Sequence, residues 1–322
     1  MDATALQTLT SPVVLFFVLG ALAAFARSDL AIPEALAKGM SLYLMAAIGL
    51  KGGVAVANSG LDANVAAALA AGVGASLLIP FWAYALLTRF GKLDRVNAGA
   101  VAAHYGSVSV VTFVTATEIL SQSGLVPGGY MVAVMAAMET PAILTGLMLA
   151  RGGAAEGKSS RRGELIHEVF LNASVVLLLG AFAIGMIAGP DGFADVSPFF
   201  DAGFKGVLCL FLLDMGLIAA RRIMGSRAVT WRLAAIAIVM PLVNGVLGTA
   251  LGTVVGLDAG SAAALGVLCA SASYIAVPAA MRLALPQADA GIYLTMSLSI
   301  TFPFNILVNV GLISWFAVML AG

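Results

Sequence analysis

Long apolar runs separated by short polar connections make up most of this chain. The run VVLFFVLGALAAFA, from residue 13 to 26, is continuously apolar and does not alternate with polar residues as a β-barrel strand does. About 20 such residues in a helix cross a bilayer, so we expect membrane-spanning α-helices. Turn signals and charges divide the chain into about ten spans, approximately 12–26, 36–57, 63–89, 95–121, 128–150, 165–188, 199–220, 228–255, 259–284 and 288–320.

Composition points to the same class of protein. Hydrophobic residues make up 61% of the 322 residues and charged residues 10%, with a mean hydropathy of +1.05. A surface of that composition would not be wetted, so we expect an all-α polytopic membrane protein. The 16 basic and 16 acidic residues cancel, which gives no indication of nucleic-acid binding. Cys209 and Cys269 lie in apolar runs without partner spacing, so neither a disulfide framework nor a metal site is indicated.

The basic residues indicate the orientation of the spans. Fourteen of the 16 Lys and Arg residues flank every second connection, whereas the alternate connections, among them PDGFADVSP (190–198), carry none. The fourteen are Arg27, Lys38, Arg89, Lys92, Arg95, Arg151, Lys158, Arg161, Arg162, Arg221, Arg222, Arg227, Arg232 and Arg282. By the positive-inside rule, the basic connections lie in the cytoplasm and both termini lie outside.

Short motifs recur in the same order at offsets of 161 to 164 residues. The pairs are VVL 13–15 with 175–177, Gly53 with Gly216, Pro80 with Pro241, SVS 107–109 with SAS 271–273, and METP 138–141 with ITFP 300–303. We therefore expect two copies of a five-helix unit, residues 1–150 and 164–322, joined by a polar cytoplasmic linker over 151–163. Since five is odd, the second copy must be inverted, as in many secondary transporters.

Two expected spans, the fourth and the ninth, contain corresponding polar stretches near their centres: HYGSVSVV (104–111) and CASASYIAVP (269–278). Irregular backbone at this depth is tolerated where it is buried in protein or lines a cavity, so we expect both spans to break into half-helices. The N-termini of half-helices suit a small anion. Hydroxyls that would assist are those of Ser107, Ser109, Ser271 and Ser273. Alternatively, the small residues allow close helix packing and the serines bond their own carbonyls.

Neither polar stretch contains Arg or Lys, which favours a monovalent anion compensated by a co-transported cation. Thr112, Thr301 and Asn305 offer oxygen ligands for sodium, and no other metal is indicated. Glu139 is a cation ligand or a proton-linked group, or it caps backbone that Pro141 leaves unpaired.

Two further charges fall inside expected spans. Lys51 in GLKGGV and Asp214 in FLLDMG occupy matching places 163 residues apart, and intramembrane charges are functional candidates. The alternatives are a structural ion pair, which includes direct pairing of the two, or a snorkelling head group. His104 is expected to be a structural group.

Longer segments around these motifs carry a family resemblance: HYGSVSVVTF, SASYIAVPAA, LAIPEALAKGMSLYLMAAIGLKGG and YLTMSLSITFPFN. Through them, essentially the whole chain resembles the sodium-dependent bicarbonate transporter family (SbtA type). The resemblance implies sodium-coupled bicarbonate uptake across a bacterial inner (plasma) membrane, with sodium as co-substrate and no other cofactor. It also implies ten helices in two inverted repeats, a homotrimer, and a core domain that moves as an elevator against a gate domain, each domain drawn from both repeats.

The resemblance further implies where the substrate binds and which partner the protein has. Bicarbonate is expected between the broken spans, at Gly106, Ser107, Val108, Ser109, Ser271, Ala272 and Ser273. Family members are often regulated by a trimeric PII-like protein (SbtB type) that docks on the cytoplasmic face.

Our leading hypothesis is therefore a sodium:bicarbonate symporter and not an enzyme. Three alternatives stay open: a sodium-coupled carrier of another small monovalent anion, a cation/proton antiporter, and a membrane sensor that binds the anion without transporting it. Uptake measurements with and without sodium, and with competing anions, distinguish these hypotheses.

Overall fold

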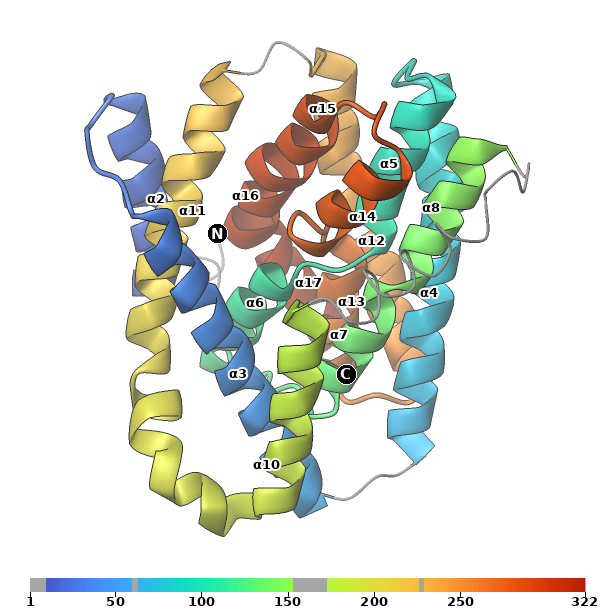
Figure 1. Ribbon diagram of the computed structural model, residues 1–322. Helices are drawn as coiled ribbons and strands as arrows, with labels where there is room; N and C mark the ends of the chain where they lie inside the picture. Colours follow the sequence, from blue (N-terminus) through green and yellow to red (C-terminus); the bar gives the residue numbers. More distant parts are fainter. Residues whose placement is uncertain (1–9, 60–62, 153–172, 226–228, 322) are drawn as a thin grey trace.

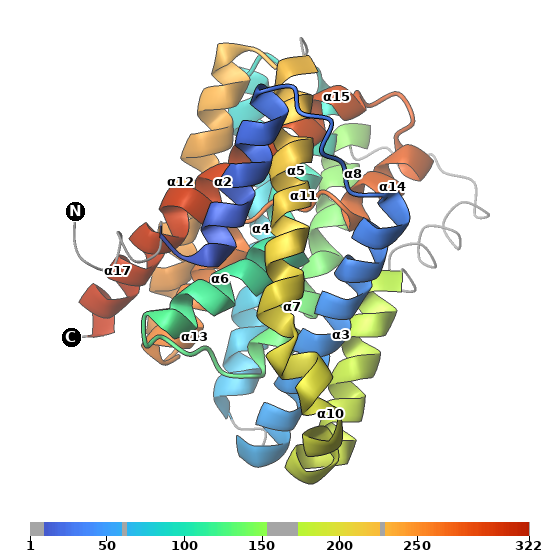
Figure 2. The same cartoon turned by 90° about the vertical axis from the view of Figure 1, so that its left-hand side faces the viewer.

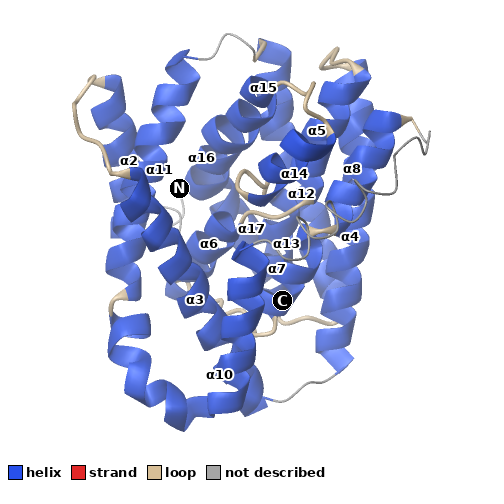
Figure 3. Ribbon diagram, in the orientation of Figure 1, coloured by secondary structure: helices blue, strands red, loops and turns tan. Residues whose placement is uncertain are grey.

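The computed structural model describes residues 10–59, 63–152, 173–225 and 229–321. Within these residues the chain is helical or irregular and contains no strand, as predicted (Figure 3). Most of the expected linker 151–163, and the start of the expected span 165–188, lie outside the described residues.

The helices follow the predicted spans closely, and the fourth and ninth spans are interrupted. The first half contains α2 (Pro12–Phe25), α3 (Glu34–Ser59), α4 (Ala63–Arg89), α5 (Arg95–Gly106), α6 (Val110–Gln122), α7 (Met131–Glu139) and α8 (Pro141–Arg151). The second half contains α10 (Ala173–Ser197), the π-helix η1 (Pro198–Ala202), α11 (Phe204–Gly225), α12 (Trp231–Val254), α13 (Ala259–Ala270), α14 (Ala276–Ala284), α15 (Ala290–Leu294), η2 (Thr295–Thr301), α16 (Phe302–Phe304), η3 (Asn305–Asn309) and α17 (Val310–Ala321).

Seven helical stretches among the described residues are long and apolar enough to cross a membrane. They are Glu34–Asn58, Asn64–Arg89, Arg95–Gln122, Met131–Arg151, Val176–Gly225, Trp231–Val254 and Ala290–Ala321. Two further apolar helices, Pro12–Phe25 and Ala259–Ala270, are shorter than the about 20 residues that a bilayer requires. The chain is a multi-pass membrane protein, as predicted, whereas the number of ten spans and their inverted repetition stay predictions.

One predicted connection is helical. PDGFADVSP (190–198) forms the last turns of α10 and the first residue of η1. Gly189 adopts a positive φ of 62°, which glycine reaches without a steric penalty, and Pro190 then starts a new helical turn. The chain therefore turns from α10 into α11 through helical backbone.

Hydrogen bonds tie several of the basic connections together at one end of the molecule, the upper end in Figure 1. The bonds run from Arg95 to the carbonyl of Leu149 (3.0 Å), from Arg151 to that of Ala284 (3.2 Å) and from Arg221 to that of Leu30 (2.6 Å). The two basic residues outside the pattern form ion pairs instead: Lys51 with Asp201 at 2.5 Å and Lys205 with Glu118 at 2.8 Å. The charge asymmetry seen in the sequence is therefore a property of the folded chain.

Two helix pairs pack with unusually close backbones: α2 against α11, and α3 against α10 (Figure 2). A Cβ atom at Gly20 of α2 would lie 2.0 Å from the carbonyl oxygen of Leu213, and one at Gly216 of α11 would lie 2.1 Å from that of Phe17. In the other pair, a Cβ atom at Gly53 would lie 2.0 Å from the carbonyl oxygen of Phe182. Glycine is needed at these positions because small residues let membrane helices approach this closely.

Candidate functional site

The first break separates α5 from α6. Helix α5 ends at Gly106, where a Cβ atom would lie 2.4 Å from the ring of Pro80, and Ser107 and Ser109 have extended backbone. The Ser109 hydroxyl accepts a hydrogen bond from the N–H of Thr112 at 3.2 Å and so caps α6. The polar stretch is thus an ordered interruption of the helix, as predicted.

The second break, between α13 and α14, is longer. Helix α13 ends at Ala270, and α14 begins at Ala276 after five non-helical residues. The residue before α14 is Ile275, whose side chain cannot cap the helix. The hydroxyl of Ser273 accepts from the N–H of Val277, although at 3.4 Å this contact is long.

The two breaks contact each other. The N–H of Ser109 donates to the Ser271 hydroxyl at 3.0 Å, and the N–H of Ser273 donates to the carbonyl of His104 at 2.8 Å. All seven residues expected to bind the anion lie in these two adjoining stretches, and all are buried: Gly106, Ser107, Val108, Ser109, Ser271, Ala272 and Ser273. Segments that are about 160 residues apart in the sequence therefore form one polar centre.

The four serine hydroxyls are not equivalent. Ser107 donates to the carbonyl of Glu139 at 2.9 Å, and Ser271 donates to that of Leu268 at 2.8 Å. Ser109 and Ser273 instead accept from backbone N–H groups, which leaves their own O–H donors for another acceptor.

Backbone donors are available beside those hydroxyls. The N–H groups of Val108, Val110, Val111 and Ala272 have no acceptor among the described residues. Buried N–H groups are almost always paired, so this concentration of free donors calls for a ligand or water. Free donors without a basic side chain suit an anion of low charge.

A family model described as the Na+-dependent bicarbonate transporter superfamily matches residues 12–318. The chain belongs to this superfamily. The resemblance seen in the sequence is confirmed, and membership makes the chain a membrane transporter, not an enzyme, with bicarbonate and sodium as its expected substrates. No curated protein matches the chain.

In a Na+-dependent transporter, Glu139 is a notable residue because its charge is buried. Its side chain is 3% exposed at the end of α7, and its carboxylate has no partner among the described residues. The role of capping backbone beside Pro141 falls instead to Ser76, which donates to the carbonyl of Met138 at 2.7 Å and accepts from the N–H of Ala142 at 3.2 Å. A buried, unpaired carboxylate is unfavourable unless a cation or a proton accompanies it.

The other three expected sodium ligands, Thr301, Asn305 and Thr112, differ from Glu139 and from one another in their hydrogen bonds. Thr301 bonds the hydroxyl of Tyr105 and donates to the carbonyl of Ala237, both at 2.6 Å. Asn305 donates to the carbonyl of Ala270 at 2.9 Å. Both side chains thus stabilise helix ends and kinks, whereas the buried hydroxyl of Thr112 has no such bond and lies in the first turn of α6.

Of the alternatives for Lys51 and Asp214, a direct pair between the two is not formed. Lys51 reaches Asp201 in η1, a segment that was expected to be near the start of the seventh span, and lies 5.0 Å from the ring centre of Phe204. Asp214 is 5% exposed on α11 and forms no hydrogen bond with any described residue. His104, expected to be structural, has its Nδ1 2.7 Å from the carbonyl of Ala100 and its ring stacked on Tyr293, while its buried Nε2 bonds no described residue.

Proposed function

We propose that this chain is a sodium-coupled bicarbonate symporter. The observation that carries the proposal is the junction of the two breaks, where free N–H and O–H donors gather without any basic side chain. Bicarbonate presents acceptor oxygens and a single negative charge, which matches such a set of donors. The proposed anion site consists of Gly106, Ser107, Val108 and Ser109 with Ser271, Ala272 and Ser273.

Sodium would bind at Glu139, with Thr112 as a second oxygen ligand. The buried carboxylate of Glu139 supports this assignment, because sodium would neutralise it. Glu139 also adjoins the first break, since its backbone carbonyl accepts a hydrogen bond from Ser107. Thr301 and Asn305, proposed as ligands from the sequence, would then act by fixing the helix ends around the site. With Glu139 neutralised by sodium, the remaining charge of the loaded site would be the single negative charge of bicarbonate, which the N–H donors and half-helix N-termini of the breaks would stabilise.

Alternating access would proceed as an elevator between two bodies drawn from both repeats. The glycine-mediated pairs α2–α11 and α3–α10 support a gate domain. The hydrogen bonds that connect Ser107 to α7, Thr301 to α12 and Asn305 to α13 support a core domain that moves as one body. The proposed architecture is ten spans in two inverted five-helix repeats.

The cellular setting belongs to the same proposal. The end that carries the basic connections would face the cytoplasm of a bacterium, with both termini outside the inner membrane. Family resemblance supports a homotrimer and a PII-like regulator on that cytoplasmic face.

The test is uptake of radiolabelled bicarbonate into proteoliposomes with an inward sodium gradient. We expect uptake that stops when sodium is replaced by potassium or when an ionophore collapses the gradient. Sodium-independent uptake would contradict the coupling, and absence of uptake with active reconstitution controls would contradict the substrate.

Cation/proton antiport is the second candidate function, and the unpaired carboxylate of Glu139 is the observation that favours it. An antiporter would acidify or alkalinise the liposome interior in response to a sodium gradient when bicarbonate is absent. We expect no such pH change from the symporter, so a pH-sensitive dye inside the same liposomes separates the two functions.

A further inference from the structure

We propose that the hydroxyl of Tyr274 is a substrate-positioning group that selects anions bearing their own O–H. This inference rests on the proposed function and adds a residue to the proposed site. Tyr274 lies in the second break, directly after Ser273, and its side chain is 9% exposed. Its hydroxyl oxygen is buried and makes no hydrogen bond with any described residue.

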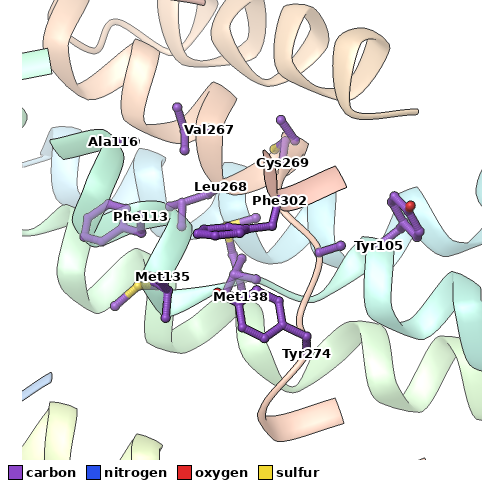
Figure 4. Packing of buried hydrophobic residues seen from close by; sticks show 14 of the residues in the cluster. Tyr105, Phe113, Ala116, Met135, Met138, Val267, Leu268, Cys269, Tyr274 and Phe302 are labelled. Carbon is purple, nitrogen blue, oxygen red and sulfur yellow. The ribbon is translucent and has the colours of Figure 1, made fainter. Parts of the chain in front are cut away.

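The position of this hydroxyl is well defined. The Tyr274 ring packs edge-to-face against Phe302, with 5.6 Å between ring centres, and Phe302 packs in the same manner on Phe17. From the break, the ring extends below Phe302 towards Met138 (Figure 4). The hydroxyl lies beside Ser109 without the geometry of a hydrogen bond. It therefore faces the first break from the second.

Comparison with another buried tyrosine shows why this hydroxyl is unusual. Tyr105, at the end of α5, is fully buried, but its hydroxyl bonds Thr301 at 2.6 Å. Tyr274 occupies the same polar centre and has no such partner. A buried hydroxyl without a partner destabilises the protein unless a ligand supplies the missing bond.

The surrounding groups indicate what that ligand is. The free N–H groups of the breaks can only donate, and the oxygens of Ser109 and Ser273 already accept from backbone N–H groups. Two buried acceptors here have no described partner: the oxygen of Tyr274, and Nε2 of His104 when its Nδ1–H donates to Ala100. Of the two, only Tyr274 lies within a break, so we assign the ligand O–H to it. Hydrogencarbonate has one O–H and three oxygens that accept, whereas nitrate has acceptors only. Tyr274 therefore positions the protonated oxygen of hydrogencarbonate.

The test compares Tyr274→Phe with the unmodified transporter in proteoliposomes. Phenylalanine keeps the ring against Phe302 and removes only the hydroxyl. We expect the KM for bicarbonate to rise about tenfold, the effect of one lost neutral hydrogen bond, with the maximal rate within about twofold. The sodium concentration for half-maximal uptake, measured at saturating bicarbonate, and the inhibition constant of nitrate should not change.

Tyr84→Phe is the matched control, because Tyr84 lies on α4, outside both breaks, and its hydroxyl has no described hydrogen-bond partner. Thermal unfolding in detergent without bicarbonate should occur at the same or a higher temperature in Tyr274→Phe, because the unpaired hydroxyl is gone. An unchanged KM, an equal weakening of nitrate inhibition, or a protein that unfolds more easily would overturn the inference. If the unmodified chain takes up no bicarbonate, the proposed function itself fails, which is a separate outcome.

Discussion

The two breaks differ in how firmly the protein holds them. The first is three residues long, is capped by Ser109 and is bonded to α7 through Ser107. The second is five residues long and leads into the nine-residue α14, whose preceding residue Ile275 offers no cap. Two similar stretches of sequence thus produce a first break that is firmly held and a second break with fewer local restraints. We infer that the first break fixes the geometry of the site and that the second adjusts to the ligand.

The helices that follow the breaks differ in charge as well. By the offset that pairs METP with ITFP, Glu139 corresponds to Thr301. The hydroxyl of Thr301 is hydrogen-bonded to Tyr105 and to the carbonyl of Ala237, whereas the carboxylate of Glu139 has no described partner. The capacity to bind a cation is therefore concentrated in the first half.

Replacement of Glu139 by glutamine should have the largest effect on function. Glu139→Gln keeps the shape of the side chain and removes the charge that would attract sodium. We expect sodium-driven uptake to fall about tenfold to a hundredfold, corresponding to about 1.5–3 kcal/mol for a charged ligand contact. The measurement is the initial rate of bicarbonate uptake as a function of sodium concentration.

Glu118→Gln is the matched control for that experiment. Glu118 lies near the other end of α6 and pairs with the exposed Lys205 at 2.8 Å, an interaction expected to contribute about 0–1 kcal/mol. Its uptake should stay near that of the unmodified protein. Equal losses in the two variants would assign the effect to general damage, and sodium dependence that survives in Glu139→Gln would refute the assignment of Glu139.

The next largest effect concerns the rigidity of the first break. In Gly106→Ala the new Cβ would lie 2.4 Å from Pro80, so we expect a loss of about 1–3 kcal/mol from overpacking and less folded protein. Gly74→Ala on α4 is the control, because nothing lies within 4 Å of its Cβ position and alanine favours the helix. The temperature of thermal unfolding measures the stability of both variants. A Gly106→Ala protein as stable as the control would show that the first break is not held tightly.

A smaller effect separates two serines of the second break. Ser273→Ala removes a free O–H donor, so we expect the KM for bicarbonate to rise about tenfold, the effect of one lost hydrogen bond. Ser271→Ala removes the acceptor of the Ser109 N–H, so we expect a loss of about 1 kcal/mol of stability and a smaller change in KM. Ser271→Ala should therefore unfold at the lower temperature, whereas Ser273→Ala should have the higher KM for bicarbonate. Identical behaviour would remove the distinction between bound and free hydroxyls.

The sequence predicted the breaks because glycine, serine and proline at bilayer depth have few alternative explanations. It also contained a usable signal for Thr301, since Pro241 leaves the carbonyl of Ala237 without its helical donor. Which side chain reaches that carbonyl depends on how distant helices pack, and local pattern does not encode it. The partner of Lys51 was missed for a similar reason, because Asp201 lies 150 residues away, in the π-helix that follows the kinked helix α10.

The starts of the two broken spans provide the smallest predicted effect, because each is capped by an aspartate. Asp94 caps α5 by accepting from the N–H groups of Val96 and Asn97, both at 3.0 Å, and Asp258 caps α13 by accepting from that of Ser261 at 3.0 Å. Each aspartate-to-alanine substitution should therefore cost about 1 kcal/mol of stability, and the loss should be larger at Asp94, which also accepts from the Asn97 side chain at 2.6 Å. Equal losses in thermal unfolding would show that the additional bonds of Asp94 contribute nothing.

The contribution of Asp94 should also depend on pH. Burial alone raises the pKa of this carboxyl, but hydrogen bonds from the Asn97 side chain and from the backbone N–H groups of Asn97 and Val96 outweigh it, so the pKa lies below its ordinary value. Because the folded-state pKa is lowered, the stabilisation is present above the unfolded-state pKa and is lost as the pH falls through the folded-state value. Asp94→Asn keeps a cap without a charge, so the gap in unfolding temperature between it and the unmodified protein should close on acidification. A gap that is constant with pH would show that the cap acts through its geometry alone.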